Sequence, residues 1–492
     1  MDWNKLVTNQ RFKQTKEQES FKYYTEYTVS QFETDYQTII NSAAFRRLQD
    51  KTQVFPLETN DFVRTRLTHS IETSFIAKKL GNMVLYNMQR KRKKESFANK
   101  AFSQNEDELL LIPDILACTG LLHDMGNPPF GHFGEVIIGE WFKENLSHLH
   151  IGDKYLYNKD GNSFLTEEEY DDLCHFEGNA QLLRVICRLY NGQSHYGMNL
   201  TNAVLASLIK YPISSSEIKK GDYKKFGYFQ ADKEIFNQIV QNTGLQKEDT
   251  VSRHPLVYLL EAADDIAYLT ADIEDALKKG TLLFDQFRRF YQEEINKYKN
   301  ELKSYDDSKI KYVLELANII INCNEENIDI CIKTWLNETR NSLMYCAAYK
   351  FVDEYYSIIN GTYKKDLFDG TFQEKTVDIL KRIAQKYIFP DKKIVKVEIS
   401  GSMILTSLLR KFIPAIMKYD CKDYKISKEN QKIVNLLPDN YIKVYKDEVS
   451  KLSGDDIEDR KMYLRLLLVT DFISGMTDSY AKRLYFELYG LE

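Results

Sequence analysis

Apolar residues recur at helical rather than strand spacing along most of the chain. Residues 67–84 carry apolar side chains three to five positions apart, which predicts an amphipathic helix with one apolar face. Residues 109–122 are nearly all apolar or small and predict a buried helix, which must end before Pro128 and Pro129. The apolar face of the first helix consists of Leu67, Ile71, Phe75 and Leu80.

Further helices are expected over 283–360, and polar segments such as 151–172 and 213–230 are expected to be loops. The spacing of apolar residues over 361–445 is less regular and does not predict long helices alone. We therefore predict an all-α protein with a large helical core and a small mixed subdomain near its C-terminus. The predicted domains are a core with an N-terminal arm over 1–360, the subdomain over 361–445, and helices over 446–492 that pack on the core.

The composition of the 492-residue chain excludes several classes of protein. Hydrophobic residues make up 43% of the sequence, which is enough to build a core and excludes a disordered chain. With only 21 glycines and 9 prolines, collagen-like and turn-dense all-β proteins are excluded and helices are favoured. The formal net charge of −5 gives no general attraction to nucleic acid.

The sequence shows no targeting or membrane-spanning segment. No apolar run approaches the roughly 18 residues that a spanning helix needs, and residues 1–5 do not open an apolar signal region. The seven cysteines form no C-x-x-C pair, which argues against a zinc–thiolate site and fits a reducing compartment. We expect a cytoplasmic protein without a membrane partner. The basic run 89–94 is interpreted as solvated surface, with phosphate or single-stranded DNA binding as the alternative.

A histidine and an aspartate close the apolar stretch that predicts a buried helix. An ionised Asp124 beside His123 is costly next to so much apolar surface unless a cation or hydrogen-bond donors satisfy it. His69 shares a helical face with Ile76 and Leu80, so we expect it to point inwards. Each residue alone could be an ordinary core residue, and a metal ion is the alternative that satisfies them together.

Acidic side chains form a stripe on the helix expected from Pro255 to about Lys278. They are Glu261, Asp264 and Asp272, with Tyr268 among them, at spacings of three, four and four. Clustered carboxylates on a largely apolar helix repel one another unless a cation or donors lie opposite. A solvated acidic face is the other interpretation, but the flanking residues are too apolar for an exposed helix.

These helices together offer two imidazoles and two carboxylates. His69, His123, Asp124 and one aspartate of the pair 264–265 would form a ligand set without thiolate, which suits manganese, iron, magnesium or zinc. Four protein ligands leave coordination positions for water and a phosphate oxygen.

A histidine followed three residues later by a carboxylate is suited to acid–base chemistry. His132 and Glu135 share a face if they are helical. The carboxylate then raises the basicity of the imidazole and fixes its orientation. Glu135 as a simple surface residue is the alternative.

Several strings of residues resemble the deoxyguanosine triphosphate triphosphohydrolase (dGTPase) family within the HD-domain metal-dependent phosphohydrolases. They spread over roughly residues 40–480, so the resemblance covers most of the chain. The strings are HDMGNPPFGHFGE at 123–135, FEGNAQ at 176–181, RHPL at 253–256 leading into EAADD at 261–265, and SGMTDSYA at 474–481.

The resemblance implies a helical HD fold and a reaction. A dNTP, with dGTP expected first, would be hydrolysed at the α-phosphorus to a deoxynucleoside and inorganic triphosphate. One divalent metal ion per subunit is implied, Mn²⁺ or Mg²⁺ in the first place and otherwise Fe²⁺, Co²⁺ or Zn²⁺. Members of the family form homo-oligomers, commonly tetramers or hexamers. Several are activated by a dNTP at a second, allosteric site, and some bind single-stranded DNA.

The resemblance also assigns catalytic roles to matching positions. The metal ligands would be His69, His123, Asp124 and Asp264. Asp264 is chosen over Asp265 because the family places this ligand four residues before a sugar-contacting tyrosine. His132, supported by Glu135, would protonate the leaving 5′-oxygen or activate the attacking water.

Substrate contacts follow in the same way. Tyr268 would pack on the sugar where a 2′-hydroxyl would clash, and basic side chains would hold phosphates through charge-assisted hydrogen bonds. The implied set is Gln53 and Asp272 at the 3′-hydroxyl, Asn127 beside the substrate, and Arg66, His175, Lys210 and Arg340 at the phosphates.

Three other functions stay open at this point. A phosphodiesterase or guanosine polyphosphate hydrolase would share the metal ligands, but we would not expect the 123–135 string in it. A dNTP-activated enzyme of broad dNTP specificity is a second alternative. A regulatory, nucleic-acid-binding protein with a degenerate HD site is the third, and intact His132 and Glu135 argue against it.

Overall fold

The computed structural model describes residues 1–13, 30–55, 62–94, 109–190, 197–221, 223–301, 307–422 and 424–490. Regular structure in these ranges is almost entirely helical, which confirms the predicted all-α class. The sequence pattern over 88–108 indicates an exposed loop or a helix extension; residues 88–94 are helical, and residues 95–108 lie outside the described residues, as does most of the expected N-terminal arm.

The helices belong to two compact units, each assembled from three stretches of chain. The first unit contains 1–8, 53–121 and 254–395, and the second contains 9–52, 122–253 and 396–492. The boundaries that we predicted at 360 and 445 do not coincide with these divisions, and the described residues of 361–445 are helices joined by turns.

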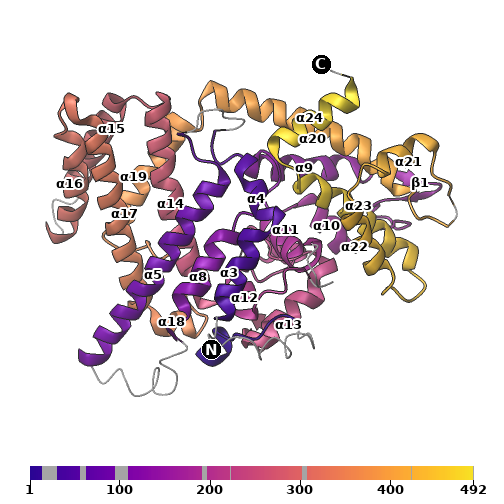
Figure 1. Ribbon diagram of the computed structural model, residues 1–492, viewed down its shortest axis with the longest axis horizontal. Coiled ribbons are helices and arrows are strands. Elements are labelled where there is room, and N and C mark those ends of the chain that lie inside the picture. The colour runs from indigo at the N-terminus through magenta and orange to yellow at the C-terminus, as the bar shows by residue number, and fades with distance from the viewer. Residues whose placement is uncertain are drawn as a thin grey trace. The chain divides into compact units, whose positions relative to one another are not determined.

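The first unit is built around three long helices that pack along one another, α5, α14 and α17 (Figure 1). The α14 helix begins at Pro255, as predicted, and ends within one residue of the predicted Lys278; His254 caps its start, and Gly280 in a left-handed conformation caps its end. The helices of this unit are α1 (Trp3–Leu6), α5 (Arg66–Lys94), α8 (Ile112–Leu122, its last residue counted with the second unit), α14 (Pro255–Lys279), α15 (Phe284–Glu301), α16 (Asp307–Ile321), η6 (Glu325–Asn327), α17 (Ile328–Asp353), α18 (Tyr355–Ile359), α19 (Glu374–Ile383) and η7 (Ala384–Ile388).

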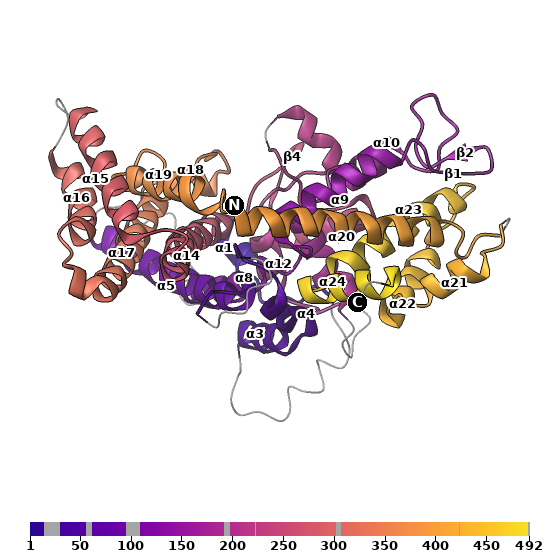
Figure 2. The same cartoon turned by 90° about the horizontal axis from the view of Figure 1, so that it is seen from above.

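The second unit has a large apolar core to which α9, α20 and α23 contribute. Figures 1 and 2 both show α20 running beside α9. Its elements are α3 (Gln31–Asn41), α4 (Ala43–Arg47), η2 (Leu48–Asp50), α9 (Gly131–Asn145), α10 (Glu167–Cys174), α11 (Gly178–Arg184), η3 (Val185–Leu189), α12 (Asn202–Leu208), η4 (Ser215–Lys220), η5 (Gln230–Asp232), α13 (Lys233–Thr243), α20 (Lys392–Met417, from Lys396), α21 (Lys428–Val434), α22 (Asp439–Val449), α23 (Ile457–Ser474) and α24 (Asp478–Tyr489). Two antiparallel pairs of short strands complete it, β1 (His150–Ile151) with β2 (Lys154–Tyr155) and β3 (Gln246–Lys247) with β4 (Thr250–Val251).

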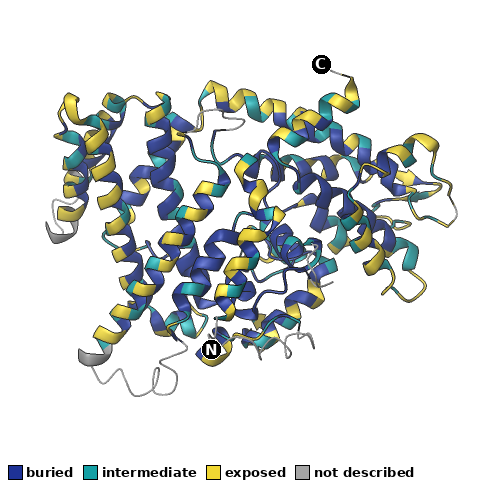
Figure 3. Cartoon of the chain, in the orientation of Figure 1, coloured by how far each residue is buried: buried dark blue, intermediate teal, exposed yellow. Residues whose placement is uncertain are grey.

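The predicted helix over 67–84 is present as part of α5, but the predicted apolar face is only partly buried. Ile71 and Phe75 are 50% and 66% exposed, whereas Ile76 and Leu80 are buried. The α5 helix is buried along one side and exposed along the other (Figure 3). Its buried residues include the polar His69 and Thr73 as well as apolar ones, and it packs against α14 and α17.

Two segments expected to be loops contain ordered structure. The range 151–172 includes a strand pair and the start of α10, whose first turn is fixed by a capping box between Thr166 and Glu169. The range 213–230 holds the 3₁₀ helix η4 and the first residue of η5, and it buries Phe226 and Phe229 in the core of the second unit.

Only α20, among the described residues, is long and apolar enough to cross a membrane by length and composition. Half of its most apolar window is buried inside the protein. Its residues Leu405, Leu408 and Phe412 belong to the core of the second unit. A core helix of this kind meets the same criterion without crossing a membrane.

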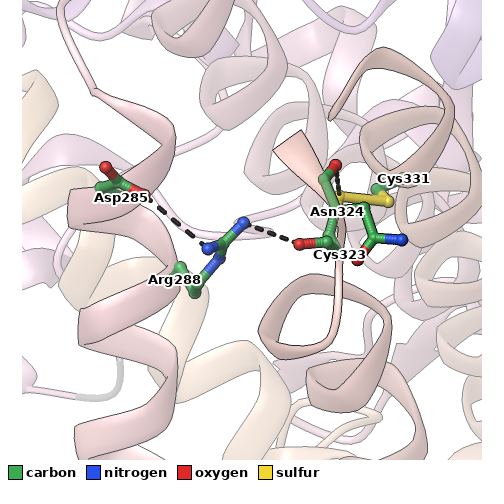
Figure 4. Close-up of a disulfide and its surroundings, with 5 residues drawn as sticks. All are labelled: Asp285, Arg288, Cys323, Asn324 and Cys331. Atoms are coloured by element: carbon green, nitrogen blue, oxygen red, sulfur yellow. Dashed lines mark hydrogen bonds and ion pairs between the residues drawn. A yellow bond between two sulfur atoms is a disulfide. The ribbon is translucent and has the colours of Figure 1, made fainter. Parts of the chain in front are cut away.

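A disulfide that the cysteine spacing does not suggest lies in the first unit. Cys323 and Cys331, whose Cα atoms are 6.1 Å apart, join the segment after α16 to the first turn of α17 (Figure 4). Arg288 of α15 donates a hydrogen bond of 2.9 Å to the carbonyl of Cys323. The other five cysteines have free thiols, and four of them are buried.

Candidate active site

The first unit brings a histidine and a carboxylate together between two of its long helices. His69 lies in the first turns of α5 and Asp264 lies on α14, with 3.2 Å between Nε2 of His69 and Oδ1 of Asp264. The His69 side chain is 1% exposed and that of Asp264 is 23% exposed. A buried imidazole beside a partly accessible carboxylate supplies the mixed nitrogen and oxygen donors expected of a divalent metal site.

Further carboxylates of α14 are buried in the same unit. Burial, with a contribution from neighbouring Asp264, raises the pKa of Asp265 to about 7, although Lys381 acts in the opposite direction. Burial also raises the pKa of Asp272 and of Tyr268 well above their ordinary values. The stripe is therefore not a solvated acidic face. A cation bound beside these buried carboxylates would favour their ionised form and so act against the effect of burial.

The helix α8 packs closely against α5 in the first unit. A Cβ added to Gly120 would lie 2.5 Å from the Cα of Ser74, and one added to Gly81 would lie 3.0 Å from the Cα of Pro113. The hydroxyl of Ser74 also donates a 2.7 Å hydrogen bond to the carbonyl of Ala117. These pairs show that the two helices run antiparallel in contact.

The second unit holds the residues that follow α8. Nε2 of His123 is 3.5 Å from Oδ2 of Asp124, and the Asn127 amide donates a 2.6 Å hydrogen bond to Oδ1 of Asp124. His123 and Asn127 are buried. Asn127 thus fixes the orientation of the Asp124 carboxylate.

The predicted acid–base pair is formed at the first turn of α9. Nδ1 of His132 lies 3.0 Å from Oε2 of Glu135, and the histidine is 71% exposed while the glutamate is 7% exposed. The interpretation of Glu135 as a surface residue is therefore wrong. The arrangement presents an accessible imidazole that is oriented from behind by a buried carboxylate.

Glu135 belongs to a buried group of charges in the second unit. Nζ of Lys225 lies 3.6 Å from Glu135 and 3.1 Å from Glu177. Burial raises the pKa of Glu177, and the nearby Glu135 raises it further. Burial alone would lower the pKa of Lys225, but the two glutamates raise it above its ordinary value. Lys225 thus offsets the repulsion between two buried acids.

One predicted phosphate ligand is engaged in another network. Nε of Arg340 donates a 2.8 Å hydrogen bond to the hydroxyl of Thr270, and Nη2 lies 3.2 Å from a carboxylate oxygen of Glu72. Arg64 binds the same glutamate at 3.0 Å. A phosphate-binding role for Arg340 stays a prediction.

The remaining predicted contacts divide between the units. Arg66, at the start of α5, is buried, and His175 caps the end of α10 with its Nδ1 3.0 Å from the carbonyl of Asp171. The first unit contains Gln53, Arg66, His69, Asp264, Tyr268, Asp272 and Arg340, and the second contains His123, Asp124, Asn127, His132, Glu135, His175 and Lys210.

Comparison with known proteins identifies the family. Residues 66–189 match the HD domain, and residues 406–487 match the phosphohydrolase-associated domain. A deoxyguanosinetriphosphate triphosphohydrolase-like protein of Listeria innocua is 43% identical over 495 residues, which cover 100% of both chains. The deoxyguanosinetriphosphate triphosphohydrolase of Salmonella typhimurium is 30% identical over 94% of both chains. The chain belongs to the deoxyguanosinetriphosphate triphosphohydrolase family.

Membership of the triphosphohydrolase family confirms that the chain is an enzyme, an HD-domain hydrolase. The HD match contains His69, His123 and Asp124 as well as the pair His132 and Glu135. Because HD domains bind divalent metal ions, the donors described above fit the family. The fourth predicted ligand, Asp264, lies beyond the match and on α14.

Sequence reasoning missed several residues that surround these side chains. Glu177 lies inside a string that resembles the family, and this string was the available signal for it. Lys51, which donates a hydrogen bond to the carbonyl of Asn127, lies two residues before Gln53. Lys225 stands in a segment that we expected to be a loop, and nothing in the sequence pattern indicated that it would contact Glu135.

Proposed function

We propose that this protein hydrolyses dNTPs, with dGTP preferred, to a deoxynucleoside and inorganic triphosphate. Similarity to a named triphosphohydrolase, 30% identity over 94% of both chains, supports the reaction class. The structural observation that carries the proposal is the exposed His132 imidazole held by the buried Glu135 carboxylate at 3.0 Å. Such a pair is suited to exchange a proton with a phosphate ester or a water.

We further propose that His69, His123, Asp124 and Asp264 hold one divalent metal ion. His69 and Asp264 lie 3.2 Å apart in the first unit, and the donor types of the four residues suit Mn²⁺ or Mg²⁺, with Fe²⁺, Co²⁺ or Zn²⁺ as further candidates. A bound divalent ion supplies Lewis-acid chemistry, which polarises a phosphoryl group.

The register of two helices in the first unit supports this ligand set. Gly81 of α5 lies against Pro113 of α8, and Ser74 lies against Gly120. The two helices are therefore antiparallel, so residues near the start of α5 lie beside residues near the end of α8. Leu121, the last residue of α8 in the first unit, therefore lies level with the early turns of α5, and His123 and Asp124 follow it closely in the sequence.

In this proposal the protein's own residues bind, orient and move a proton. Glu135 accepts a hydrogen bond from Nδ1 of His132, which fixes the tautomer and directs Nε2 towards the substrate. Nε2 then donates a proton to the leaving 5′-oxygen or accepts one from the attacking water. Positioning and electrostatic stabilisation provide the rest of the rate.

The substrate contacts are also proposed. Tyr268 packs on the deoxyribose where a 2′-hydroxyl would clash, which makes the enzyme selective for deoxynucleotides. The other contacts are Gln53 and Asp272 at the 3′-hydroxyl, Asn127 beside the substrate, and Arg66, His175, Lys210 and Arg340 at the phosphates. A homo-oligomer, a tetramer or hexamer, an allosteric dNTP site, single-stranded DNA as a further partner and a cytoplasmic location complete the proposal.

Product analysis tests the reaction directly. The purified protein is incubated with Mn²⁺ and each dNTP, singly and as an equimolar mixture, and products are separated by anion exchange. Deoxyguanosine and triphosphate from dGTP alone are the expected products. Activity only in the mixture would indicate an enzyme that a second dNTP activates. Pyrophosphate, single phosphate or no product in any sample would contradict the proposal.

A metal measurement tests the ligand set separately. We expect the wild-type protein to retain about one divalent ion per chain after desalting, and His123→Ala to lose it. A His123→Ala variant with full metal content would contradict the assignment of that ligand, whatever reaction the protein catalyses.

A further inference from the structure

The string 474–481 resembles the family, yet none of the proposed chemistry uses it. Asp478, the first residue of α24, is 2% exposed. One of its carboxylate oxygens accepts hydrogen bonds from the backbone N–H of Thr52, at 3.0 Å, and from the Thr52 hydroxyl. The other accepts a 3.0 Å hydrogen bond from the backbone N–H of Phe130. A single buried carboxylate thus joins α24 to two distant segments of the second unit.

Phe130 is the residue that this carboxylate holds at the start of α9. It is the N-cap of the helix and has a φ of 63°, a left-handed conformation that a bulky side chain rarely adopts. Its side chain makes no capping hydrogen bond, and its own N–H is bound by Asp478. The direction in which α9 leaves the preceding loop is therefore set at this residue, two positions before His132.

A second contact fixes Phe130 from the other side. A Cβ added to Gly401 of α20 would lie 2.8 Å from the Phe130 ring, so the ring packs directly on the helix backbone. Asp478 holds the backbone of Phe130 and Gly401 accommodates its ring. Both contacts come from helices of the C-terminal third of the chain.

A buried lysine strengthens the same connection. Lys51 is 4% exposed and donates hydrogen bonds to the carbonyl of Asn127, at 2.6 Å, and to the carbonyl of Ser474, at 2.8 Å. It therefore links the loop between Asp124 and His132 to the residue that ends α23. Lys51 and Asp478 thus connect Asn127 and Phe130, two positions of this loop, to the same C-terminal string.

We propose that Asp478 is a positioning residue for His132. It does not touch the reacting groups; it fixes the backbone of Phe130 and with it the placement of the imidazole relative to the substrate. The inference rests on the proposed function, because it assigns a task in that reaction. It gives the C-terminal phosphohydrolase-associated segment a mechanical role in acid–base chemistry.

The variant Asp478→Asn tests the inference. A carboxylate accepts at both oxygens, whereas an amide places an N–H₂ group against either the Thr52 or the Phe130 backbone N–H. We expect kcat for dGTP hydrolysis to fall on the order of 10- to 100-fold, as a small misplacement of a catalytic group does. KM and the metal content are expected to stay near their wild-type values.

A double-mutant cycle distinguishes positioning from general damage. If Asp478 acts through His132, Asp478→Asn lowers the residual rate of His132→Ala no further. Thr477→Ala is the matched control, because it removes the neighbouring cap of α24 without touching Thr52 or Phe130, and kcat is expected to stay unchanged. An unchanged kcat in Asp478→Asn, or an equal loss in the presence and absence of His132, would overturn the inference.

Two further measurements keep the test independent of folding and of the proposed reaction. Gly401→Ala displaces the Phe130 ring with Asp478 intact, and the same non-additivity with His132 is expected of it. Crystal structures of the wild type and Asp478→Asn report the His132 position without turnover. If the wild type releases no triphosphate, the proposed function fails, while an unmoved His132 in the variant overturns the positioning role itself.

Discussion

At the scale of single residues, His132 and Glu135 differ in solvent exposure, and this difference suits the proposed roles of proton carrier and orienting carboxylate. The histidine is 71% exposed and the glutamate 7% exposed, although they lie three residues apart on one helix. Spacing alone predicts that the two share a face, but it does not tell which of them reaches solvent. Lys225 and Glu177, which surround the buried carboxylate, come from segments that are distant in the sequence.

The variant His132→Ala removes the proposed proton carrier and leaves the metal ligands in place. We expect metal content to be retained and kcat for triphosphate release to fall by at least about 10²-fold, as is typical when a general acid or base is lost. Steady-state kinetics together with metal analysis of the same preparation checks this. His148→Ala, at an exposed histidine of the same unit, is the control and should keep full activity. Unchanged turnover in His132→Ala would refute the assignment.

At the scale of elements, helix existence was easier to predict than helix contacts. The sequence pattern predicts α8 and α14 well, because each combines a strong apolar period with clear end signals. It fails for the face of α5, where Ile71 and Phe75 are exposed. Periodicity detects large apolar side chains. The contact between α5 and α8 instead depends on small residues such as Gly81 and Gly120, which allow the two backbones to approach closely.

Gly120 provides a test of that close packing. A methyl group at this position would lie 2.5 Å from the Cα of Ser74, so Gly120→Ala must push α8 away from α5. Overpacking of this kind costs about 1–3 kcal/mol of unfolding free energy. We expect a lower Tm and, because His123 directly follows α8, weaker binding of Mn²⁺ in a titration followed by calorimetry.

The control for this variant lies on the same helix. Asp114→Ala removes only a surface ion pair with Lys78, which is worth little, and should leave both Tm and metal affinity nearly unchanged. If Gly120→Ala binds Mn²⁺ as tightly as the wild type does, the α5–α8 contact is not what places the metal ligands.

At the scale of the whole molecule, the sequence could indicate the class of fold but not the composition of its units. Each unit combines three separated stretches of chain, and the predicted boundaries at 360 and 445 assumed contiguous domains. Thr52 and Asp478, 426 positions apart, share hydrogen bonds that no local pattern encodes. Asp478 lies in a string that resembles the family. The string alone does not show that Asp478 contacts Thr52, because a sequence pattern carries no information on which distant segments pack together.

A buried carboxylate in the second unit makes a prediction about stability and pH. Asp172 of α10 accepts hydrogen bonds from the hydroxyls of Ser215 and Tyr463 and from the backbone N–H of Gln230. Burial raises its pKa from 3.8 to about 7, although these hydrogen bonds act in the opposite direction. The folded state therefore binds this proton more tightly than the unfolded state does. The associated stability is present below about pH 4 and is lost as pH rises to about 7.

The variant Asp172→Asn keeps this position neutral at every pH. Its amide oxygen can accept from Tyr463 and Gln230 while its N–H₂ group donates to Ser215, so the hydrogen-bond network survives. We expect the Tm of the variant, relative to the wild type, to rise steadily between pH 4 and pH 7 and to stay constant above that. Thermal unfolding across this range measures it, with Asp160→Asn on an exposed turn as the control. A Tm difference that does not change with pH would show that Asp172 is ionised throughout, and that the hydrogen bonds outweigh its burial.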